Sequence, residues 1–141
     1  MRSILILLSL LVTASAAFSQ KKILDHADFD HWKTIEGARL SPDGRWVTYV
    51  LEPGEGDPTL VIYDAQNRTS REFERADEAS ISADSRFVVF RIHPPLDTLK
   101  AQRRRKVKED KLPRDTLGIY RLAEGRLVKV ADLKSYQLPE N

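Results

Sequence analysis

The chain has no cysteine, and this absence excludes disulfide bonds, thiolate metal sites and lipid attachment through a cysteine. Its six glycines stand at positions 37, 44, 54, 56, 118 and 125, so no two of them are four residues apart. The Gly-x-Ser-x-Gly turn that exposes the nucleophile of many serine hydrolases is therefore missing. The 23 Lys and Arg residues nearly balance the 21 Asp and Glu residues, and this balance indicates no particular class of partner.

The longest apolar run, Ile4–Val12, is interrupted only by Ser9. It has about half the length that a membrane-spanning helix needs. Arg2 precedes this run and small residues follow it, an order typical of a secretory signal peptide. We expect cleavage after Ser19, so that the mature chain begins at Gln20 and carries no transmembrane helix. The expected location is the periplasm or the outside of the cell.

Two segments of the chain resemble two later segments in the same order, which indicates an internal repeat. Ser41–Val50 (SPDGRWVTYV) matches Ser82–Arg91 (SADSRFVVFR) at an offset of 41 residues. Thr59–Asp64 (TLVIYD) matches Thr116–Arg121 (TLGIYR) at an offset of 57 residues. The second unit therefore carries 16 additional residues between its two middle strands.

Each unit is expected to form four short strands, which is the period of one β-propeller blade. In the first unit, Pro42 and Gly44 are typical of a tight turn before the second strand. Ser85 replaces Gly44 in the second unit, and a left-handed backbone there would cost about 1 kcal/mol. The expected strands are 39–40, 45–51, 60–63 and 69–73 in the first unit, and 79–82, 87–92, 117–122 and 127–130 in the second.

The predicted fold class is all-β: two four-stranded propeller blades, an incomplete β-propeller, after a signal peptide and a short helical lead-in. Leu60–Tyr63 and Phe87–Phe90 are continuously apolar, so both faces of these strands should be covered. Neighbouring blades provide such cover, and a β-sandwich is the alternative. Two apolar faces should stay open, one of them bearing Trp46 or Phe87. The expected divisions are 1–19 signal peptide, 20–37 lead-in with a short helix, 38–75 first blade, 76–131 second blade with a basic insertion at 96–114, and 132–141 the start of a further blade.

The Ser41–Val47 turn and strand resemble the blade repeat in the N-terminal propeller of bacterial prolyl oligopeptidase and dipeptidyl peptidase-like serine peptidases. Periplasmic TolB-like propellers share this repeat. The segment Asp28–Lys33, the basic insertion, and the segments Leu112–Leu117 and Lys134–Glu140 strengthen the resemblance to the peptidases. The resemblance implies that further propeller blades and an α/β-hydrolase domain follow in the full-length protein, with a serine triad in that domain.

We therefore expect a non-catalytic N-terminal propeller fragment of an exported peptidase, which gates and orients peptide substrates in the full-length enzyme. The alternative is a TolB-like binding propeller without hydrolase activity. We assign no catalytic, cofactor-binding or metal-binding residue and expect no cofactor.

Three other groups of residues have ordinary structural interpretations. His26 and His31 lie among three carboxylates but do not share a helical face, so we expect a capped helix held by Phe29, Trp32 and Ile35 instead of a metal site. Lys100–Arg114 is strongly basic, yet no aromatic residue lies between Arg91 and Ile119 to stack on bases. We expect a solvated, partly helical insertion there and no nucleic-acid partner. Gly54–Asp57 is expected to be an ordinary loop, and Glu72 and Glu74 a solvated strand edge.

Overall fold

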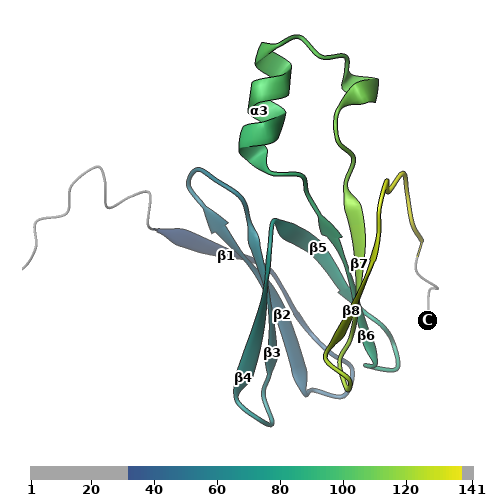
Figure 1. Ribbon diagram of the computed structural model, residues 1–141. Helices are drawn as coiled ribbons and strands as arrows, with labels where there is room; N and C mark the ends of the chain where they lie inside the picture. The colour runs from purple at the N-terminus through teal and green to yellow at the C-terminus, as the bar shows by residue number, and fades with distance from the viewer. Residues whose placement is uncertain (1–31, 138–141) are drawn as a thin grey trace, which may run out of the picture.

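The computed structural model describes residues 32–137, which form two four-stranded antiparallel sheets that lie against each other (Figure 1). Each sheet is a meander in which neighbours in sequence are also neighbours in space. The predicted all-β pair of propeller blades is confirmed. Blade 1 consists of β1 (Lys33–Leu40), β2 (Trp46–Pro53), β3 (Thr59–Asp64) and β4 (Thr69–Glu74), and blade 2 of β5 (Ala76–Ile81), β6 (Phe87–Ile92), β7 (Thr116–Arg121) and β8 (Arg126–Val130).

The two blades share one apolar core, which lies between the sheets. Phe73 of β4 packs its ring against Phe90 of β6 and Tyr120 of β7, with ring centroids 4.9 and 5.1 Å apart. Leu60 and Ile62 of β3 are almost completely buried in the same cluster. Neither sheet could bury these side chains alone, so the blades stabilise each other.

The continuously apolar segments Leu60–Tyr63 and Phe87–Phe90 lie in the middle strands β3 and β6, as predicted. The expected strands at 45–51 and 87–92 correspond to β2 and β6, which lie in different sheets at equivalent positions. Trp46, however, packs against the core between the blades, so its placement on an open face is wrong. Trp46 pairs across the sheet with Asp64 and shares the face of Thr48 and Val50, because alternate residues of a strand point to the same side.

The first blade begins earlier than expected. Residues 33–37 belong to β1, although the sequence suggested a lead-in with a short helix over residues 20–37. Lys33–Glu36 pairs with the last residues of β2, and this pairing satisfies backbone groups that a helix would otherwise satisfy. Ile35, which was expected to hold the helix, lies in the strand and is 63% exposed. Residues 20–31, the predicted signal peptide at 1–19 and residues 138–141 lie outside the described part.

Hydrogen bonds between the blades define two ends of the molecule. The β1–β2 turn meets the β5–β6 turn at one end, where the backbone N–H of Asp43 donates to Ser85 Oγ (3.2 Å). At the other end a single residue, Arg75, links the blades. Its N–H donates to the carbonyl of Pro58, and its carbonyl accepts from His93, both at 2.7 Å. The basic insertion starts at this second end, with helix α3 (Leu96–Arg104) and a 3-10 turn, η1 (Glu109–Lys111).

Candidate functional site

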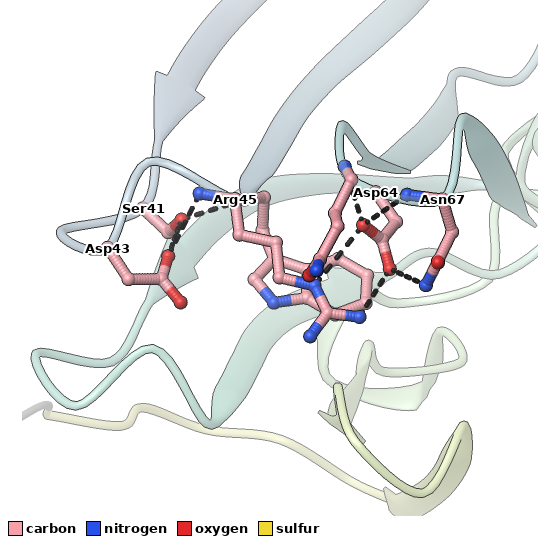
Figure 2. A network of polar contacts seen from close by, with 7 residues as sticks. Ser41, Asp43, Arg45, Asp64 and Asn67 are labelled. Atoms are coloured by element: carbon pink, nitrogen blue, oxygen red, sulfur yellow. Dashed lines mark hydrogen bonds and ion pairs between the residues drawn. The ribbon is translucent and has the colours of Figure 1, made fainter.

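The turn between β1 and β2 is held by the side chains of Ser41 and Asp43 (Figure 2). Ser41 Oγ donates to Asp43 Oδ1 and accepts from the backbone N–H of Trp46 at 2.8 Å. The same Asp43 oxygen accepts from the N–H of Arg45 at 3.1 Å. The hydrogen bond from Ser41 holds the pKa of Asp43 below its usual value, with the Arg45 N–H adding to the effect. The Ser-x-Asp motif thus fixes the entry of β2.

The turn between β5 and β6 repeats this geometry. Ser82 Oγ donates to Asp84 Oδ1 at 2.6 Å and accepts from the N–H of Phe87 at 3.0 Å. Ser85 has φ of 53° and Gly44 has φ of 72°, so Ser85 adopts the left-handed backbone whose cost was considered above. Glycine would avoid the strain at this position, but the serine hydroxyl accepts a hydrogen bond from the backbone N–H of Asp43 in blade 1. This hydrogen bond joins the two blade turns.

In blade 1 an ion pair holds the turn between β3 and β4, and blade 2 has no equivalent of this pair. Arg45 donates to both oxygens of Asp64, at 3.2 and 2.7 Å, and Asn67 Nδ2 donates to Asp64 at 2.9 Å (Figure 2). These contacts hold the pKa of Asp64 far below its usual value, and the hydrogen bond from Arg45 has the largest effect. Arg121 of blade 2 stands at the position equivalent to Asp64, 57 residues later, so the charge there is reversed. Arg121 pairs with Glu124 at 2.9 Å. The repeated backbone therefore carries different charges at this end.

The two ends of the basic insertion are clamped by a histidine between two carboxylates. His93 follows β6, and its Nδ1 lies 3.0 Å from Asp115 Oδ1, just before β7. Its Nε2 lies 2.9 Å from Asp77 Oδ1 of β5. An imidazole with a carboxylate at each nitrogen is favoured in the protonated form, and the contacts with Asp77 and then Asp115 raise the pKa of His93 to about 9. His93 was not among the residues predicted from the sequence, although its position beside the insertion was visible there.

The insertion is also fixed to blade 1. Asp57 Oδ1 accepts from the backbone N–H of Leu96 at the start of α3 (3.1 Å). Lys100 Nζ lies 2.7 Å from Glu55 Oε1. The Gly54–Asp57 loop is therefore the seat of the helix, a role that the sequence did not suggest.

The open face of blade 1 has a buried counterpart in blade 2. Strand pairing places Ile35 and Leu40 on the side of β1 that faces away from blade 2, and these side chains are 63% and 64% exposed. The residues 41 positions later are Ala76 and Ile81, which lie in the shared core or pack against it. The open face of blade 1 is thus equivalent to the face that blade 2 buries.

The open face of blade 2 has a counterpart in the same way. Val130 of β8 is 49% exposed, and the residue 57 positions earlier is Phe73, which packs on the aromatic side chains of blade 2. Phe87 lies on this open face, as expected, because it alternates with the buried Val88. Each open face is therefore one half of the interface that the two blades already form. Such an interface is head-to-tail, so it leaves one unpaired half on each blade, and its repetition forms a ring where the rotation between neighbours closes.

The remaining sequence candidates lie apart from these faces or outside the described residues. His26 and His31 are outside, and among residues 32–137 no group of three or more His, Cys, Asp or Glu side chains is placed to hold a metal ion. Glu72 and Glu74 share one side of β4, as predicted, and both are exposed. No helix within residues 32–137 is long and apolar enough to cross a membrane.

Solved structures with a similar fold are two acylaminoacyl peptidases and the β-propeller domain of a protease. An acylaminoacyl peptidase in complex with Z-Gly-Gly-Phe-chloromethyl ketone matches 78% of this chain with a TM-score of 0.56 and 19% identity. The acylaminoacyl peptidase of Pyrococcus horikoshii matches 84% with a TM-score of 0.57 and 18% identity. The β-propeller domain of the Trilobed protease from Pyrococcus furiosus, described as having an open velcro topology, matches 76% with a TM-score of 0.51 and 20% identity.

The matched region is a small part of each of these proteins. This chain covers 16% and 17% of the two acylaminoacyl peptidase chains and 30% of the Trilobed protease propeller chain. No protein-family model and no curated protein sequence matches the chain. At this level of identity the similarity establishes the fold: residues 32–137 form two consecutive blades of a β-propeller.

Proposed function

We propose that this chain is the non-catalytic N-terminal part of a propeller in an exported serine peptidase that resembles the prolyl oligopeptidase family. In that enzyme the propeller restricts access to the active site and orients peptide substrates. The supporting observation is the equivalence between the open and the buried blade faces. Ile35 and Leu40 are exposed where their counterparts Ala76 and Ile81 contact the core between the blades, so both open faces are suited to further blades.

The similar folds favour a peptidase over other propeller proteins. The solved structures that match are two acylaminoacyl peptidases and the propeller domain of a protease. The motifs in Leu112–Leu117 and Lys134–Glu140 resemble the same group of enzymes. The partners that follow from this proposal are further blades, an α/β-hydrolase domain and peptide substrates.

The complete reading frame that contains this sequence provides the first test. We expect further blade repeats and then a Gly-x-Ser-x-Gly motif, and we expect the expressed protein to hydrolyse short peptides in preference to long unfolded polypeptides. A frame that encodes only additional blades, with no hydrolysis by the purified protein, would contradict the peptidase and favour a TolB-like binding propeller.

Gating is tested by opening the contact between blade 1 and its neighbour. Substituting Ile35→Asp and Leu40→Asp places charges on the face that a further blade would cover. We expect cleavage of long polypeptides to increase relative to cleavage of short peptides. The control is Ala65→Asp at the exposed turn after β3, which should leave the ratio unchanged. Equal ratios in all three proteins would refute the gating role.

A further inference from the structure

The basic insertion at residues 96–114 concentrates positive charge at one end of the blades. It contains eight Lys and Arg residues and three Asp and Glu residues, a local net charge of +5. Figure 1 shows α3 and the following turn standing beyond the ends of the strands, on the side opposite the serine turns. A flat surface could therefore approach the insertion without meeting the blades first.

Most of these cations have no partner within the described part of the protein. Lys100 pairs with Glu55, and Arg103 lies 3.6 Å from Glu109. The other six are exposed and have no ion pair with residues 32–137: Arg104, Arg105, Lys106, Lys108, Lys111 and Arg114. The C-terminal end of a helix favours cations, which accounts for those nearest to α3. It does not account for Lys108, Lys111 and Arg114, which lie beyond that helix.

The contacts at the base give the insertion a fixed position. His93, just before the insertion, contacts Asp115, just after it, and Asp77 of β5 contacts the other nitrogen of the same imidazole. Asp57 and Glu55 attach α3 to blade 1. The unpaired cations are therefore presented on a supported projection, which concentrates their charge on one side of the molecule.

The side chains of the insertion distinguish between possible anionic partners. Aromatic residues are absent from this part of the sequence, so stacking on nucleic-acid bases is unavailable. Its large apolar residues, Leu96, Leu99, Val107 and Leu112, are half-buried and offer no exposed anchor for a peptide. A surface of anionic phospholipid can be bound without aromatic stacking and without an apolar anchor. The lipids diffuse in the plane of the membrane and gather beneath fixed cations.

We propose that the insertion binds the surface of a membrane that contains anionic phospholipid, through the six unpaired cations and without inserting apolar side chains. This binding is independent of peptidase activity. Each Lys or Arg near an anionic surface strengthens binding by about 5-fold, so removal of three should weaken it on the order of 100-fold.

The test compares three forms of the full chain on two kinds of vesicle, phosphatidylcholine alone and phosphatidylcholine with phosphatidylglycerol. The insertion variant is Arg104→Gln, Arg105→Gln and Lys106→Gln. The control removes three exposed cations from the blades: Arg71→Gln, Arg126→Gln and Lys129→Gln. Vesicles of phosphatidylcholine alone measure what the apolar segment Ile4–Val12 contributes, which is the same in every form.

We expect the preference for anionic vesicles to fall on the order of 100-fold in the insertion variant and much less in the control. Raising the salt from about 0.01 M to about 1 M should abolish the preference, since the Debye length shrinks from about 30 Å to about 3 Å. Equal losses in both variants would overturn the proposal, as would equal binding to both vesicles. Tighter binding to polyglutamate than to vesicles of equal charge would also overturn it and would indicate an acidic protein partner.

Discussion

The contact between Gly118 and Phe90 provides a sharp test of the interface between the blades. Gly118 lies in β7 directly opposite Phe90, whose ring is fully buried. A Cβ atom at Gly118 would lie 2.6 Å from Phe90 Cε2 and 2.8 Å from Cζ. The ring cannot easily retreat, because Phe73 of blade 1 packs on it with a centroid distance of 4.9 Å. We therefore predict that Gly118→Ala forces the two blades to repack.

The expected cost follows from two opposing effects. Overpacking of a core costs about 1–3 kcal/mol. Replacing glycine by alanine lowers the entropy of the unfolded chain and returns about 0.4–1 kcal/mol. The free energy of unfolding of Gly118→Ala should thus fall by about 1–2 kcal/mol. Urea unfolding followed by tryptophan fluorescence measures this change, since Trp46 packs against the core between the blades.

The matched control is Gly54→Ala, where an added Cβ would contact nothing within 4 Å. This variant should be as stable as the parent chain or slightly more stable. In a Phe90→Leu background, Gly118→Ala should lose most of its cost, because the clashing ring atoms are gone. Equal stability of Gly118→Ala and Gly54→Ala would refute the close packing of β6 on β7 described above.

Three further predictions concern the insertion and the turns. The pKa of His93 rises from 6.5 to about 9 on folding, so the free energy of unfolding should be highest below pH 6.5 and fall by up to about 3 kcal/mol as the pH rises through 9. His93→Gln should flatten this dependence in urea titrations at several pH values, and an unchanged slope would contradict the clamp. Ser85→Gly relieves left-handed strain but loses the hydrogen bond to Asp43, so its stability should change by less than about 1 kcal/mol. Ser85→Ala loses the same hydrogen bond but keeps the strain, so it should be less stable than Ser85→Gly in thermal unfolding, and the reverse order would contradict left-handed strain at this position. Deletion of Leu99–Lys111 removes an exposed ion pair with Glu55 but no buried residue, so calorimetry should show a loss of less than about 1 kcal/mol. A cooperative loss of the blades would instead make the insertion structural.

The local sequence was sufficient to predict the blades. The Ser-x-Asp turns satisfy their own backbone through side chains two to five residues away, so their geometry is encoded locally. The offsets of 41 and 57 residues also identified β2 and β6, and β3 and β7, correctly as equivalent strands of the two blades. Strands and turns are determined by neighbours in sequence, and these are what a single sequence displays.

The first strand of each blade shows where the repeat ceased to be visible. The pairing is shifted between Glu36 and Arg39 and again between Asp77 and Ser80. The left-handed residues at these bulges are Gly37 and Glu78, 41 positions apart but chemically unlike. The sequence therefore concealed this equivalence, and β1 was placed partly in a helical lead-in.

The sequence alone determined that this chain repeats a four-stranded unit with an insertion in the second copy. Only the tertiary structure decided that Trp46 faces the neighbouring blade, that His93 joins Asp77 to Asp115, and that the Gly54–Asp57 loop holds α3. These contacts join residues between 16 and 45 positions apart or on different sheets. Their geometry depends on the twist and spacing of the two packed sheets, which no local pattern specifies.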